Sequence, residues 1–126
     1  RHGAVATSIA HDSHNIIVIG DNDDDMAAAV EKLISIGGGI TMFKDGKELG
    51  THVLEIAGLM TDDTADEVVR CLEDMHKSAD EELHVRKDID PFMTLCFMAL
   101  PVIPSYKLTD CGLFDVRSFQ FVDSAL

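Results

Sequence analysis

Two apolar runs separated by a short polar turn are the feature that most constrains how this chain can fold. Residues 4–10 (AVATSIA) are mostly small or β-branched, and residues 16–20 (IIVIG) form a continuous aliphatic run that a glycine ends. Runs of this kind are typical of strands, and the second has the pattern of a strand that is buried on both faces. The sequence therefore predicts two strands joined by a polar turn at residues 11–15.

That turn carries the strongest candidates for a functional site, which are His11, Asp12, Ser13, His14 and Asn15. The two histidines could bind a metal ion, with Asp12 as a third ligand or as a hydrogen-bond partner of one histidine. Alternatively, one histidine could act as an acid or base that Asp12 orients. In a third interpretation, the side chains only cap backbone groups and tie the two strands together. The residues alone leave these three interpretations open.

An acidic segment and a glycine triplet bracket the first predicted helix. Residues 21–25 include four aspartates, whose charges suit the N-terminal end of a helix and whose spacing is not that of an EF-hand. Leu33 and Ile34 lie on the expected apolar face. The glycines at 37–39 follow this helix and precede a strand, which is the reverse of the order in a phosphate-binding loop. We interpret them as a helix C-cap with close backbone packing.

Two further helices are predicted in the second half of the chain. A capping box at residues 64–67 begins one that runs to about residue 83. We expect His76 and His84, on or near its polar side, to be solvated. An Asp-Pro pair begins the other helix, residues 92–100, which is apolar nearly all round. We therefore expect this last helix to be central and buried.

The remaining strands come in groups rather than singly. Asp45-Gly46 predicts a two-residue hairpin within residues 40–49, and residues 53–56 form a further expected strand. Residues 107–115 contain turn chemistry, and residues 119–122 are expected to form a last short strand. The pattern predicts an α/β fold, with α+β as the alternative: a mixed sheet in a layered sandwich with about three packed helices.

Length, charge and cysteine content limit the classes of protein. The 126 residues fit one domain, and 46% of them are hydrophobic, enough for a packed core. A net charge of −13 argues against nucleic acid or an anionic membrane as a partner. No apolar run reaches bilayer length, so we expect a cytoplasmic protein. Cys71 and Cys96 are interpreted as reduced core thiols, and the absence of a CxxC pair argues against structural zinc.

Motifs along nearly the whole chain resemble the C-terminal domain of bacterial adenine deaminase, which belongs to the amidohydrolase superfamily. The first is the HDSHN turn with the IIVIG run that follows it. The others follow in the family's order: IGGG at 36–39, IAGLM at 56–60, DPFMTL at 90–95, ALPVIP at 99–104 and KLTDCGLFD at 107–115. Several specific motifs in the same order make a chance resemblance improbable.

The resemblance implies an enzyme of purine salvage that hydrolyses adenine to hypoxanthine and ammonia. It also implies a catalytic manganese or iron in an N-terminal (β/α)₈ barrel, which is the expected partner of this domain. This chain has no HxH motif and about half of the roughly 250 residues such a barrel needs. We therefore expect residues 1–126 to be a single accessory domain that needs no cofactor and is inactive alone.

Within that resemblance, the turn would help to close the active site, contact the substrate or hold an extra metal at His11 and His14. Asp12 would orient a histidine, and Asn15 would hydrogen-bond a purine edge. The alternative function is a stand-alone ligand-binding or assembly module, which could form a homo-oligomer. The sequence also departs from the family at Arg1-His2, where the family has a glycine-rich stretch after such a pair. That stretch is either deleted or left out between His2 and Gly3.

Overall fold

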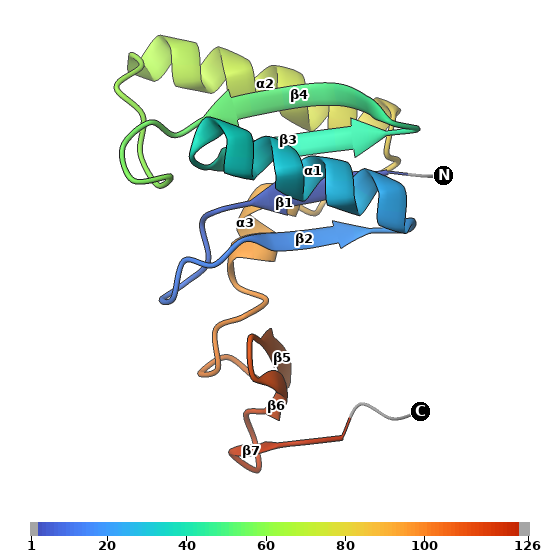
Figure 1. Ribbon diagram of the computed structural model, residues 1–126, viewed down its shortest axis with the longest axis vertical. Helices are drawn as coiled ribbons and strands as arrows, with labels where there is room; N and C mark the ends of the chain where they lie inside the picture. Colours follow the sequence, from blue (N-terminus) through green and yellow to red (C-terminus); the bar gives the residue numbers. More distant parts are fainter. Residues whose placement is uncertain (1–2, 124–126) are drawn as a thin grey trace.

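The computed structural model describes residues 3–123, so that Arg1 and His2 lie outside the described residues. Within this range a four-stranded sheet in the order β2-β1-β3-β4 and three helices form a body, and a three-stranded sheet β5-β6-β7 forms an arm (Figure 1). The body consists of β1 (Ala4–Thr7), β2 (Ile17–Gly20), α1 (Asp23–Ile36), β3 (Gly39–Lys44), β4 (Lys47–Val53), α2 (Ala65–Glu81) and α3 (Pro91–Cys96). The arm consists of β5 (Tyr106–Thr109), β6 (Gly112–Asp115) and β7 (Gln120–Phe121).

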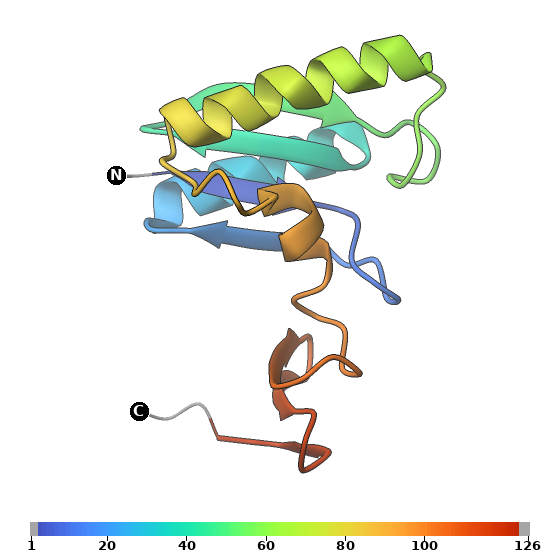
Figure 2. The same cartoon turned by 180° about the vertical axis from the view of Figure 1, so that it is seen from behind.

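The body has three layers, because α1 covers one face of its sheet while α2 and α3 cover the other (Figures 1 and 2). Alternate residues of β1 point to opposite faces. Ala4 and Ala6 pack against Leu33 of α1, whereas Val5 joins the cluster formed with α2 and α3. The central strand β1 is therefore buried on both sides, and the predicted layered α/β fold with about three helices is confirmed.

Strand pairing is antiparallel in both sheets, where the sequence pattern had indicated a mixed sheet. The turn after β1 reverses the chain, so β2 runs antiparallel to it. Helix α1 then carries the chain across to the far side of β1, where β3 pairs. Strands β2 and β3 therefore run in the same direction, but β1 lies between them.

The ends of α1 are as predicted, but its buried face is rotated. Asn22 caps the N-terminus and Gly37, at φ 79°, caps the C-terminus. The residues buried along the helix are Asp25, Ala29 and Leu33, which recur every fourth position. Ile34 lies about 100° further round the helix and is 66% exposed, so its predicted place in the core was wrong.

The later helices differ from the prediction in extent. The capping box at Thr64 is present, and His84 is exposed as expected. His76 is only half-exposed, since its Nε2 atom lies 3.5 Å from Asp90 Oδ2 and its ring lies against that of Phe92. Helix α3 is shorter than predicted and not buried all round: Met93 and Met98 are exposed, because only one side of this short segment meets the sheet. No helix in residues 3–123 is long and apolar enough to cross a membrane.

Two segments of strand were also placed wrongly. Strand β4 continues to Val53, and residues 54–60 form a compact turn instead of a separate strand. Residues 107–115 form most of the β5–β6 hairpin. The Thr109 hydroxyl accepts a hydrogen bond from Cys111 N and donates one to Gly112 O. The turn is therefore confined to the tip of the hairpin. The hairpin at Asp45-Gly46 is confirmed, with positive φ at both residues as a type I′ turn requires.

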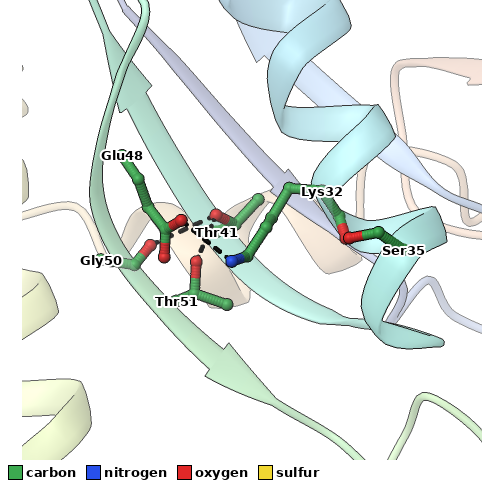
Figure 3. A network of polar contacts seen from close by, with 6 residues as sticks. All are labelled: Lys32, Ser35, Thr41, Glu48, Gly50 and Thr51. Atoms are coloured by element: carbon green, nitrogen blue, oxygen red, sulfur yellow. Dashed lines mark hydrogen bonds and ion pairs between the residues drawn. The ribbon is translucent and has the colours of Figure 1, made fainter.

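A polar network joins α1 to β4 (Figure 3). Lys32 Nζ lies 3.0 Å from Glu48 Oε2, and the Thr51 hydroxyl bonds to Thr41 at 2.7 Å. A hydrogen bond from Thr51, followed by the contact with Lys32, lowers the pKa of the Glu48 carboxyl. The ionised form of Glu48 therefore contributes to the stability of the folded state.

We expect Glu48→Gln to lower the free energy of unfolding by about 0.5 kcal/mol at pH 7, since solvent screens this partly exposed ion pair. Because the folded-state pKa is lowered, this contribution is present above the unfolded-state pKa and is lost as the pH falls through the folded-state value. Urea unfolding at several pH values between 7 and 3 measures it. Glu73→Gln, at an exposed position of α2, is the control, and an equal loss in both variants would contradict the prediction.

Candidate functional site

The exit of β1 is fixed by one hydroxyl group just before the polar turn. Ser8 Oγ accepts a hydrogen bond from Gly39 N at 2.8 Å and donates one to Gly58 O at 2.5 Å. The glycine triplet and the IAGLM segment therefore meet at this side chain. A Cβ atom built on Gly38 would lie 2.5 Å from the Cα atom of Gly58, so the close backbone packing predicted for the triplet is present.

The turn itself is held by backbone hydrogen bonds and by one ring contact. His11 N donates to Cys96 O at 3.0 Å, which ties the turn to the end of α3. His14 N donates to Ala10 O at 2.6 Å. The His11 ring stacks on Phe97, with centroids 4.9 Å apart and planes inclined by 11°. The turn therefore has a defined conformation although most of it is exposed.

His14 has a distinctive hydrogen-bonding state. Its Nδ1 atom accepts a hydrogen bond from Ala10 N at 3.3 Å. In the neutral imidazole, an acceptor at Nδ1 places the ring proton on Nε2. Because the side chain is exposed, the Nε2–H group of His14 is accessible to a ligand or to solvent.

The five candidate residues are brought onto one turn, but they do not form a complete metal site. The ring centroids of His11 and His14 are 5.9 Å apart. Residues 3–123 contain no group of three or more histidine, cysteine, aspartate or glutamate side chains that could hold a metal ion. The Nδ1 atom of His14 already accepts a hydrogen bond from Ala10 N. A metal held by these two histidines stays a prediction.

An apolar groove of about 790 Å³ lies beside the turn and was not predicted. Its walls come from the turn (Ser13 and Asn15), from β2, from the end of α3 and from the arm. The sequence had indicated that residues 16–20 are buried on both faces. That prediction was wrong for this chain, because β2 is an edge strand and Ile19 is 59% exposed. The sequence signal for this surface was the uninterrupted aliphatic run, which contains no charged residue.

The cysteines are all free, and they differ in environment. Cys96 is buried as predicted, whereas Cys71 is only half-buried. Burial raises the pKa of both thiols, which lowers their thiolate content and their reactivity. Cys111 is exposed and lies on the wall of the groove.

Comparison with known proteins assigns the sequence to a family. Residues 1–120 match the family model described as adenine deaminase C-terminal domain. The chain belongs to this family. A relative named adenine deaminase from Nitratidesulfovibrio vulgaris (strain DP4) is 57% identical over 121 residues, and one from Bacillus subtilis (strain 168) is 51% identical over 122 residues. A third, named adenine deaminase 2, from Carboxydothermus hydrogenoformans, is 52% identical over 126 residues.

The adenine deaminase C-terminal domain is only a part of each relative. The match covers 96% of this chain but 21% of the Nitratidesulfovibrio protein, and 97% of this chain but 21% of the Bacillus protein. The chain thus spans about a fifth of the length of the relatives it matches. The predicted resemblance is confirmed, and the alternative of a stand-alone module is not favoured.

Proposed function

We propose that this domain is the accessory part of a metal-dependent adenine deaminase, a cytoplasmic enzyme that hydrolyses adenine to hypoxanthine and ammonia. The family match and the names of the relatives support this activity for the complete polypeptide. The catalytic manganese or iron would be held by a barrel domain that precedes this one. Within this domain, we infer that the HDSHN turn borders the active site of that barrel.

The observation that carries the proposal is an ordered turn whose hydrogen-bonding groups face outward. Its backbone is fixed through Cys96 O and Ala10 O, whereas Asp12, His14 and Asn15 are exposed. These exposed groups are free to meet a ligand without a rearrangement of the backbone. Groups held in place before the substrate arrives lose little entropy when they bind it.

The exposed groups match the chemistry of a purine. Adenine offers N7 as an acceptor and the N6 amino group as a donor, and an asparagine amide can pair with both. Asn15 would bind this edge or hold a water molecule beside it. The Nε2–H group of His14 would donate to a ring nitrogen or to the oxygen that enters during hydrolysis. Asp12 would orient a histidine, and the turn as a whole would exclude bulk water from the site.

We expect His14→Asn in the full-length enzyme to lower kcat/KM for adenine at least tenfold, because it removes the Nε2–H donor and the shorter asparagine amide does not reach its position (about 1.5–3 kcal/mol for a hydrogen bond to developing charge). Asparagine tolerates the positive φ of this position, so Tm should change little. Ammonia release measures kcat/KM, and differential scanning calorimetry measures Tm. This chain alone, supplied with Mn²⁺ or Fe²⁺, should release no ammonia.

The matched control is His84→Asn, which replaces an exposed histidine that also has a positive φ. It should keep full activity. If His14→Asn changes kcat/KM by less than twofold and lowers Tm instead, the turn is structural and its proposed contact with substrate is wrong.

A further inference from the structure

We propose that the groove between β2 and the arm is a docking surface for the polypeptide that precedes this domain in the same enzyme. An apolar segment of that polypeptide would lie along β2 and against the aromatic side of the arm. The proposal rests on the proposed function, because it requires that the domain is part of the longer enzyme. Beyond the proposed function, it specifies the surface at which the two parts meet and the apolar contacts that join them.

The first argument is the exclusion of charge from the groove. Charged residues make up 26% of the chain, yet Asp110 is the one charged residue on the groove wall. The other lining side chains are mainly aliphatic or aromatic, with a few neutral polar groups on the turn and on the arm. A strongly acidic protein that keeps acidic groups away from one concave surface has a surface suited to an apolar partner.

The second argument is the open edge of the body's sheet. Within the described part of the chain, β2 pairs with β1 alone. Ile19 on this strand and Ile16 just before it are exposed, and no charged residue interrupts the run from 16 to 20. Proteins usually protect an exposed apolar edge with charge, proline or a covering element. Residues 16–20 contain neither a charged residue nor a proline, so we infer that a covering element protects this edge.

The third argument is that the arm is too small to be stable by itself. Its strands have four, four and two residues, and a small sheet needs a packed face to be stable in water. Phe114 is buried between Phe119 and Phe121, but Phe119 itself is 73% exposed. Both views show the arm standing away from the layers of the body, on the side of β2 (Figures 1 and 2). A partner in the groove would supply the packed face that the arm's small sheet needs.

The preceding polypeptide is a better occupant than a second copy of this chain. In the relatives, about four-fifths of the polypeptide lies outside the matched segment. A covalently linked partner acts at an effective concentration of the order of millimolar, far above that of a separate molecule in the cell. The groove also continues into the turn through Ser13 and Asn15, which the proposed function places at the border of the preceding barrel.

Cys111 is a native reporter of this contact. It is exposed and lines the groove, whereas burial raises the pKa of Cys71 and Cys96. Labelling by N-ethylmaleimide at pH 7, followed by mass spectrometry of the peptide that contains Cys111, measures its accessibility in the full-length enzyme. The reference is the thiol of Glu31→Cys, at an exposed position of α1. We expect Cys111 to react at least tenfold more slowly than this reference.

A pair of substitutions tests the surface itself. Ile19 and Val69 are similarly exposed in the domain, at 59% and 53%, but Ile19 lines the groove and Val69 lies on α2. In the full-length enzyme, Ile19→Lys should raise the labelling rate of Cys111 to that of the reference. Val69→Lys should leave it slow. Leu108→Lys, on the arm, is a second groove variant for the case in which Ile19→Lys does not fold, as judged by circular dichroism.

The outcomes separate this proposal from the proposed function. An active adenine deaminase in which Cys111 reacts as fast as the reference overturns the docking proposal alone. Protection that appears only as the protein concentration rises identifies a second copy as the occupant and also overturns it. Concentration-independent protection that Ile19→Lys removes supports docking, even in a protein that releases no ammonia from adenine, which would reject the proposed activity.

Discussion

Gly38→Ala is expected to lower the free energy of unfolding by about 3 kcal/mol, the sum of backbone strain and overpacking. Gly38 has a φ of 118°, which a residue with a side chain rarely adopts. The added methyl group would lie 2.5 Å from the Cα atom of Gly58 and 2.9 Å from Ser8 Oγ. Neither the Gly58 backbone nor Ser8, whose hydroxyl bonds to Gly39 N and to Gly58 O, can move without a loss of other contacts.

The neighbouring glycine provides the control. Gly37 also has a positive φ, 79°, but a Cβ atom there would meet no atom within 4 Å. Gly37→Ala should therefore cost only about 1 kcal/mol, from the left-handed backbone conformation. Urea denaturation of both variants measures the difference. Equal losses would mean that the crossing of the two loops at Ser8 is not tightly packed.

Asp25→Ala is expected to destabilise the domain by about 2–4 kcal/mol, since it removes a buried carboxylate that accepts three hydrogen bonds, two of them from backbone N–H groups. The Asp25 carboxylate is 1% exposed and accepts hydrogen bonds from Asp45 N at 3.0 Å, from Gly46 N at 2.7 Å and from Asn22 Nδ2 at 2.8 Å. One side chain therefore joins the N-terminus of α1 to the β3–β4 hairpin. Its removal should loosen both.

Asp24→Ala separates this network from the general effect of negative charge at a helix N-terminus. Asp24 occupies the same first turn of α1 but is exposed. Its loss should cost less than 1 kcal/mol, which is the usual magnitude of an exposed charge near a helix dipole. Thermal and chemical unfolding of the two variants compare them. A loss for Asp24→Ala as large as that for Asp25→Ala would attribute the stabilisation to charge rather than to the hairpin contacts.

Features of the fold that depend on neighbouring residues could be predicted from the sequence. The Asn22 and Gly37 caps, the capping box at Thr64 and the hairpin at Asp45-Gly46 each follow from the conformational preference of a few adjacent residues. The exposure of Ile19 could not be predicted in this way. It follows from the place of β2 at the edge of the sheet, and the order of strands in a sheet is not a local property of the sequence.

The position of the turn that carries the candidate residues was predictable, but the hydrogen bonds that fix it were not. The polar residues of the turn stand out between two apolar strands, and the family resemblance singles out the same segment. The contact of Ser8 with Gly39 and Gly58 joins residues 31 and 50 positions apart, which no local pattern can indicate. The acceptor role of His14 Nδ1 depends on the conformation of the turn, so the ring proton could not be assigned from the sequence.

The open edge of β2 has a consequence for the solubility of the domain. A strand with high β-propensity, no charge and no proline is a template for pairing between molecules, which is the first step of β-aggregation. The net charge of −13 opposes this step, because like-charged molecules repel one another before their edges meet. Whenever the groove is unfilled, the acidity of the domain therefore protects it from self-association, and high salt concentration weakens this protection by screening the repulsion.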